Sequence, residues 1–210
     1  MNILNRVGPC LAAIAAVAVG AVNARATPLN FVTVCAPLHC VVLNTPCVET
    51  QSTVTVGIIG VSSLVWSGPA RVQTRTFKLN FPPTGPKNFY EYQVDLTHAV
   101  TDAEFACITD LAIDFGPLIK LQYNGTGQLD HVYVLQDSAS AIGLLAVDQT
   151  NGVITFTFSE PICAGVTPGT GHASRVFGLA SPFPPKAIVA KVSVPALDPI
   201  DVAARAPQHR

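Results

Sequence analysis

Three cysteines and one histidine lie within thirteen residues of the sequence: Cys35, His39, Cys40 and Cys47. Such side chains can bind zinc, carry out redox chemistry or form disulfides. A zinc site usually combines two half-sites of similar spacing, and a redox site usually has the C-x-x-C spacing, which the sequence lacks. The group therefore favours disulfide bonds, and we predict no metal ligand, no cofactor-binding residue and no cofactor.

Two further cysteines follow in the second half of the chain. The alternating pattern predicts that Cys107 lies on the inward face of a strand, and we expect it to pair with Cys163, which follows another strand. We expect a second disulfide within the group Cys35, Cys40 and Cys47, with one cysteine left over. Because connectivity cannot be read from a sequence, a bond between that group and Cys107 or Cys163 remains an alternative.

Two short motifs approach catalytic or ligand-binding signatures without matching them. The string Gly60–Leu64, with Ser62 at its centre, lacks the second glycine and the following helix of a nucleophile elbow. The glycines between Gly165 and Gly171 are not followed by the Gly-Lys-Ser/Thr of a phosphate-binding loop. We therefore predict no catalytic residue here and interpret the glycine-rich segment as a surface loop.

Four acidic residues are close together in the sequence: Asp102, Glu104, Asp110 and Asp114. Oxygen-rich clusters can bind calcium, but this spacing is not a calcium loop. Alternation puts Asp110 and Asp114 on the solvent side of their strand, so exposed carboxylates are the favoured interpretation. A pair of catalytic carboxylates would need one acid with a raised pKa, usually through burial, which nothing in the sequence predicts.

Exposed aromatic rings could stack on sugars, but Tyr90 and Tyr92 share a face with apolar Val94 and Leu96, which favours packing in the core. The triplet Asn124-Gly-Thr matches an N-glycosylation acceptor. It also has the composition of a turn, which is the interpretation we adopt.

The elements that position these residues are short strands. Apolar residues alternate with polar ones in the segments Arg75–Phe81, Tyr90–Leu96, Phe105–Phe115 and Val153–Phe158, and no segment has a long helical period. Clusters of Gly, Pro and Asn separate the strands, and Asn151-Gly152 is the strongest hairpin signal. The pattern predicts an all-β fold, an antiparallel β-sandwich of the jelly-roll or immunoglobulin-like kind, stapled by disulfides.

The composition supports one domain with a large apolar core. Hydrophobic residues make up 49% of the chain and charged residues 12%, and the basic residues are scattered rather than clustered. A protein that binds nucleic acid normally gathers Lys and Arg on one face, so we expect no nucleic-acid partner.

The chain begins like an exported protein. Arg6 precedes an apolar run, Cys10–Val22, and Ala24-Arg-Ala26 has the form of a signal-peptidase site. We expect a signal peptide over residues 1–26 with cleavage near Ala26, a β-sandwich domain over 27–195 and a disordered tail over 196–210. The mature protein would be secreted or periplasmic, with no membrane span; an uncleaved anchor is the alternative.

The segment Val153–Gly165, an alternating strand that ends in Cys-Ala-Gly, followed by Val176–Leu179, resembles secreted bacterial β-sandwich ectodomains, including those of exosortase-sorted (PEP-CTERM) proteins. The sorting tail of that class is absent here. The resemblance implies an envelope or matrix protein without chemistry of its own.

Our leading hypothesis is an exported structural, adhesive or binding protein without catalytic activity. The first alternative is a carbohydrate-binding, lectin-like module, and the second is a secreted hydrolase whose site follows no motif. The expected partners are a polysaccharide or a protein of the cell envelope or extracellular matrix, whose identity the sequence does not give.

Overall fold

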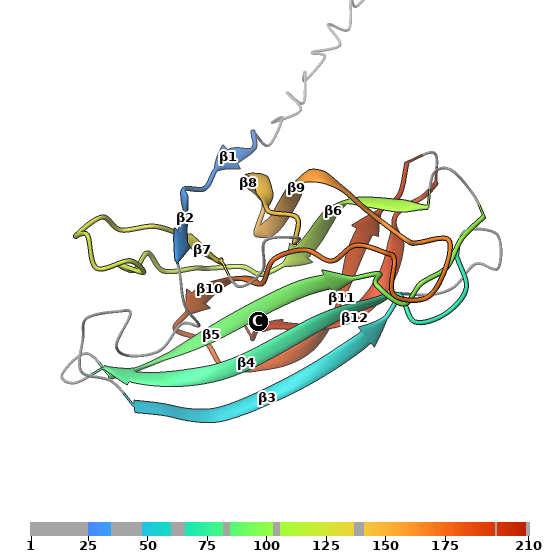
Figure 1. Cartoon of the computed structure of the whole chain (residues 1–210). Helices are drawn as coiled ribbons and strands as arrows, with labels where there is room; N and C mark the ends of the chain where they lie inside the picture. The colour runs from blue at the N-terminus through green and yellow to red at the C-terminus, as the bar shows by residue number, and fades with distance from the viewer. Residues whose placement is uncertain are drawn as a thin grey trace, which may run out of the picture.

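Two β-sheets packed face to face make up the part of the chain that the structure describes (Figure 1). This computed structural model describes residues 25–34, 48–59, 66–81, 85–102, 106–136, 141–195 and 197–208, and within those ranges it contains no helix. The strands are β1 (Thr27–Pro28), β2 (Phe31–Val34), β3 (Val48–Ile58), β4 (Arg71–Phe81), β5 (Gly85–Asp95), β6 (Cys107–Asp114), β7 (Val132–Leu135), β8 (Leu144–Thr150), β9 (Val153–Cys163), β10 (Phe177–Ser181), β11 (Pro185–Ser193) and β12 (Ile200–Pro207).

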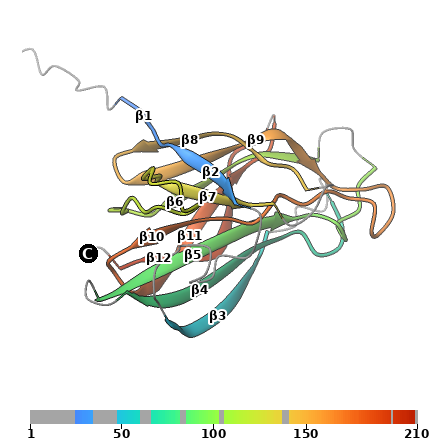
Figure 2. The same ribbon diagram turned by 60° about the vertical axis from the view of Figure 1, so that its left-hand side comes forward.

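The described strands form two sheets with the orders β1-β8-β9-β6-β11-β12 and β2-β7-β10-β5-β4-β3. Neighbouring strands are antiparallel except for β2 and β7, which pair in parallel. Figure 2 shows β3, β4 and β5 as long neighbouring ribbons of one sheet and β8 and β9 in the other. Most neighbours in the sheets are distant in the sequence, so long-range pairing defines the fold.

The alternating segments form strands because one face of each strand enters a common core between the sheets. In β9, for example, Ile154 and Phe156 are fully buried and Phe158 is 4% exposed, while Thr155 and Thr157 lie on the other face. The predicted all-β fold, a β-sandwich with a disulfide, is confirmed. The described residues contain no helix with the length and apolar character that a bilayer crossing requires.

The hairpin predicted at Asn151-Gly152 joins β8 to β9. Asn151 has a φ of 51° and Gly152 a φ of 86°, which is the pair of positive values that a two-residue type I′ turn requires. Asparagine and glycine tolerate this conformation, so the local sequence and the long-range pairing agree at this position.

The disordered tail expected over 196–210 is wrong for Ile200–Pro207, which form β12 along the edge of one sheet and pair with β11 over eight residues. Val202 and Ala204 are 2% exposed and Ala206 is fully buried. The alternation is present, but two of its four apolar positions, Ile200, Val202, Ala204 and Ala206, are alanines, whose weak hydrophobic contrast conceals the strand in the sequence.

The inward orientation expected for Cys107 is also wrong. The pairing of β6 with β9 is irregular between Ile108 and Asp110, so the two sides of the irregularity have opposite phases. Ile108 and Leu111 are fully buried, whereas Cys107 is half-buried on the opposite face. A strict period of two across the whole segment therefore misplaced the cysteine.

Candidate ligand-binding site

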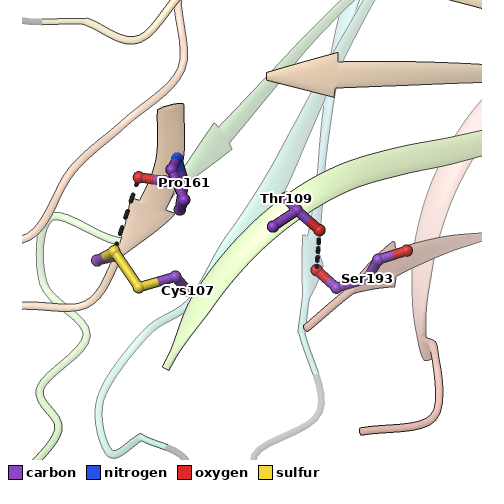
Figure 3. Close-up of a disulfide and its surroundings, with 5 residues drawn as sticks. Cys107, Thr109, Pro161 and Ser193 are labelled. Atoms are coloured by element: carbon purple, nitrogen blue, oxygen red, sulfur yellow. Dashed lines mark hydrogen bonds between the residues drawn. A yellow bond between two sulfur atoms is a disulfide. The ribbon is translucent and has the colours of Figure 1, made fainter. Parts of the chain in front are cut away.

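The disulfide between Cys107 and Cys163 is present, as predicted (Figure 3). The two cysteines face each other in the register of β6 and β9, beside the buried pair Ile108 and Ile162. The Sγ atom of Cys163 lies 3.6 Å from the carbonyl oxygen of Pro161; this is a close contact rather than a hydrogen bond, because a disulfide sulfur carries no hydrogen. The bond joins two strands of one sheet and fits an oxidising compartment.

The four remaining cysteines, at positions 10, 35, 40 and 47, lie outside the described residues, as do Ser62, Glu104 and the rest of residues 1–24. The second disulfide and the signal peptide therefore stay predictions.

The acidic residues do not come together as a metal site. Within the ranges that the structure describes, no group of three or more His, Cys, Asp or Glu side chains is arranged to hold a metal ion. Asp110 accepts hydrogen bonds from the hydroxyls of Thr109 at 2.8 Å and Thr157 at 2.7 Å, while Asp102 and Asp114 are exposed. Asp110 is thus half-buried and hydrogen-bonded rather than fully solvated as expected.

The two tyrosines are in the core, as the alternation predicts. Tyr90 is fully buried and Tyr92 is 1% exposed. Their hydroxyls donate hydrogen bonds to backbone carbonyls, Tyr90 to Phe183 at 2.8 Å and Tyr92 to Arg205 at 2.7 Å. Each ring therefore spans the core and ties its sheet to backbone near the opposite sheet, which leaves neither tyrosine free to stack on a sugar.

The glycosylation triplet forms a turn. The side-chain oxygen of Asn124 accepts hydrogen bonds from the backbone N–H of Thr126 at 3.1 Å and from its hydroxyl at 2.7 Å. Gly125, between them, has a φ of 74°. The turn interpretation is confirmed, and glycosylation of Asn124 stays untested.

The outer face of the sheet that contains β4 and β5 carries ion pairs that the sequence analysis missed. Arg75 contacts Glu91 at 3.1 Å, and the hydroxyl of Tyr133 donates to the same carboxylate at 3.1 Å. Glu91 is only 4% exposed, and a buried carboxylate needs a partner for its charge. The guanidinium of Arg75 is that partner. Burial raises the pKa of Tyr133, and the negative charge of Glu91 raises it further.

A second ion pair joins the same two strands, four residues from the first along each strand. Arg71 contacts Asp95 at 2.7 Å, and Thr97 donates to the same carboxylate through its hydroxyl at 2.6 Å and its backbone N–H at 3.0 Å. Burial alone would raise the pKa of Asp95, but these hydrogen bonds and the guanidinium charge outweigh burial and lower it. The carboxylates of both ion pairs already have partners within the protein, so we assign the two pairs a structural role in the sheet.

A cavity lies at the end of the sandwich where the β8–β9 hairpin turns, and we call it the terminal cavity. The backbone oxygen of Gly152 accepts hydrogen bonds from the N–H groups of Phe115 at 3.0 Å and Gly116 at 2.9 Å. The side chain of Gln149 donates to the carbonyl oxygen of Gly116 at 2.9 Å. These bonds hold the end of β6 against the hairpin tip, so the wall of the cavity is fixed by backbone contacts.

The terminal cavity has a volume of about 720 Å³, and its described lining is mostly polar: Arg25, Thr27, Asp114, Gly116, Pro117, Gln149, Asn151, Gly152, Val153 and Lys186. One carboxylate, two cations, two amides and a hydroxyl offer both hydrogen-bond donors and acceptors. Binding sites for small molecules typically span about 300–1,000 Å³, so the cavity is large enough for one or two sugar rings. Of the sequence candidates, only Asp114 lies in it.

Histidines do not complete a catalytic arrangement in the part of the chain that the structure describes. His131 accepts a hydrogen bond at Nδ1 from the backbone N–H of Asn30 at 3.1 Å, and no described histidine is hydrogen-bonded to a serine or cysteine side chain. In comparisons with protein-family models, curated proteins and solved structures, no match to the chain was found.

Proposed function

We propose that this protein is an exported binding protein that holds a carbohydrate in the terminal cavity and has no catalytic activity of its own. The observation that supports the proposal most directly is the terminal cavity itself, whose described lining offers both hydrogen-bond donors and acceptors. Sugar hydroxyls both donate and accept, so a mixed lining of this kind suits them better than a lining of one charge.

The terminal cavity combines backbone held in place with charged side chains. The backbone at Gly116 and Gly152 is held by hydrogen bonds, and Asp114 and Lys186 contribute a carboxylate and an ammonium to the same lining. The described lining holds no aromatic ring, so the affinity must come from hydrogen bonds and not from stacking. We therefore expect weak binding to a single site and stronger binding when several copies act together.

Processing would alter the cavity. Cleavage after Ala26, as the sequence predicts, removes Arg25 and exposes a new α-amino group on Thr27, which lines the same cavity. One cation is thereby exchanged for another at a nearby position. The mature protein beginning at Thr27 is the form to test, since the precursor presents a different wall.

The experiment is a glycan array probed with the mature protein displayed on tetrameric streptavidin, followed by calorimetry with the strongest ligand. We expect Asp114→Asn and Lys186→Gln each to weaken binding about tenfold, the loss of one charge-assisted hydrogen bond. The matched control is Lys191→Gln, on the same strand as Lys186, which removes an exposed lysine paired with Asp201 outside the cavity.

An array without a reproducible ligand would refute the carbohydrate proposal. Ligand binding that survives both cavity variants at the wild-type affinity would move the site elsewhere. Covalent labelling by probes for serine or cysteine nucleophiles would instead favour the hydrolase that the sequence left as an alternative.

A further inference from the structure

A second cavity lies between β3, β4 and β5 of one sheet and β11 and β12 of the other; we call it the inter-sheet cavity. It has a volume of about 280 Å³ and shares no residue with the terminal cavity. Its described lining is Thr53, Thr76, Phe77, Lys78, Asn88, Pro185 and Arg205. The volume lies below the usual range for drug-sized ligands, so it suits a small ion or one chemical group.

The charges of this lining have one sign. Lys78 and Arg205 are cations, and no carboxylate is among the described residues that line the cavity. Asn88 and the hydroxyls of Thr53 and Thr76 add neutral donors. One N–H of the Asn88 amide already donates to the carbonyl oxygen of Pro182 at 3.3 Å, which fixes the orientation of the amide. Two like charges beside one cavity repel each other until an anion enters.

Arg205 also has an unused donor. Its Nε atom is buried and makes no hydrogen bond among the residues that the structure describes. A buried donor on a charged group that lacks a partner is costly, and native proteins rarely leave one so. A guanidinium offers Nε–H and a terminal N–H as a parallel fork, which matches two oxygens of a carboxylate, sulfate or phosphate.

The backbone of Arg205 is held in place. The carbonyl oxygen of Arg205 accepts a hydrogen bond from the hydroxyl of Tyr92 at 2.7 Å, and Arg205 pairs with Ala187 of β11 in the sheet. The guanidinium charge lies close enough to Tyr90 to oppose the rise that burial causes in the pKa of that tyrosine. Arg205 is thus a half-buried cation on a fixed strand, and not a free surface side chain.

We propose that the inter-sheet cavity binds an oxyanion group, with the Nε–H fork of Arg205 as the main ligand and the ammonium of Lys78 as the second. The proposal is independent of carbohydrate binding at the terminal cavity. The group can be the carboxylate of an organic acid, or sulfate or phosphate, since all of them present two oxygens to the fork. The role of Asn88 is to supply a neutral donor at the rim.

The test uses nuclear magnetic resonance of the ¹⁵N-labelled mature protein, because the Nε–H group of an arginine gives its own signal. The Arg205 signal is assigned by its absence in Arg205→Lys. Sodium acetate, sodium sulfate and sodium phosphate are titrated separately at constant ionic strength, with sodium chloride as the reference salt. We expect the Arg205 signal to shift to saturation with at least one oxyanion and not with chloride.

Variants establish which residues bind. Lys78→Gln should weaken the saturating anion at least tenfold, whereas Lys191→Gln should leave its affinity unchanged. Lys78 is half-buried at the edge of the cavity, so its substitution tests the site even if Arg205 variants fold poorly. The order of affinities identifies the class of ligand. A preference for acetate indicates the carboxylate of an organic acid, and a preference for sulfate or phosphate indicates the free ion or its ester. A shift that rises linearly with every salt, or equal affinity in Lys78→Gln and the wild type, would overturn the proposal.

Discussion

Replacing both cysteines of the resolved disulfide by alanine, Cys107→Ala with Cys163→Ala, should destabilise the domain by about 4 kcal/mol. The bond closes a loop with a sequence separation of 56 residues. In the chain-entropy treatment, a loop of this length removes about 14 cal/mol/K from the unfolded state, which is about 4 kcal/mol at 25 °C. Since both cysteines are half-buried, loss of their own packing contributes little beside this figure.

The free energy of unfolding can be followed through Trp66, the single tryptophan of the sequence, which is 3% exposed and should change its fluorescence on unfolding. Equilibrium urea titrations of oxidised wild type and double variant at 25 °C give the difference. For a domain of this size, 4 kcal/mol corresponds to a fall in melting temperature of about 8–16 °C. The other cysteines are unchanged in both proteins, so they cancel in the comparison.

The double serine variant, Cys107→Ser with Cys163→Ser, is the control for side-chain identity, because it breaks the same covalent bond with a different replacement. Equal losses in the two double variants assign the effect to the cross-link. A loss below about 1 kcal/mol, with the denaturant dependence unchanged, would show that the cross-link does not restrict the unfolded chain as assumed and that the entropic reasoning fails here.

Three other predictions concern packing, pH and the edge strand. Gly178→Ala should cost about 1–3 kcal/mol, because its new Cβ would lie 2.6 Å from the ring of Tyr133 and from a backbone oxygen; Gly143→Ala, whose Cβ has no neighbour closer than 3.9 Å, is the control in the same thermal melts. The lowered pKa of Asp95 means that the folded state binds fewer protons than the unfolded state. Its contribution to stability should therefore be complete above the unfolded pKa of about 3.9 and disappear as the pH falls through the folded value, and urea titrations of Asp95→Asn should lack this acid-side loss. Deleting β12 should lower the melting temperature by many degrees, since it uncovers the apolar core; an unchanged melting curve would show that the strand is dispensable.

The strands that sequence reasoning located are those whose alternating residues differ most in hydrophobicity. Arg75–Phe81 and Tyr90–Leu96 fall within or beside β4 and β5, and the Asn151-Gly152 turn is where the pattern placed it. These features are local, since strand alternation and positive φ are properties of neighbouring residues. Between β6 and β7, by contrast, Ile119 and Leu121 form only isolated bridges, with Ala180 and Asp130.

The two wrong predictions, the face of Cys107 and the disordered tail, concern features that depend on the neighbouring strand. The irregular pairing between β6 and β9 reverses the phase at Cys107, yet the disulfide forms because the same irregularity places Cys163 directly opposite. The pairing partner was therefore right although the face was wrong. Two of the buried side chains of β12 are alanines, which favour a strand only weakly. The segment is extended because its backbone pairs with β11.

Neither cavity could be predicted, because each is formed by residues that only the sheet order brings together. Asp114 ends β6, Gln149 lies on β8 and Lys186 is the second residue of β11, and these strands are not consecutive in the chain. In the inter-sheet cavity, Lys78 of one sheet and Arg205 of the other line the same space, and the sequence analysis had assigned Arg205 to a disordered tail. The two cavities differ in charge: the described lining of the terminal cavity carries both signs, and the charged residues that line the inter-sheet cavity are both cations. Since a β-sandwich leaves its two ends and its open flank free of core packing, each exposed boundary of this fold can acquire binding chemistry without disturbing the apolar layer between the sheets.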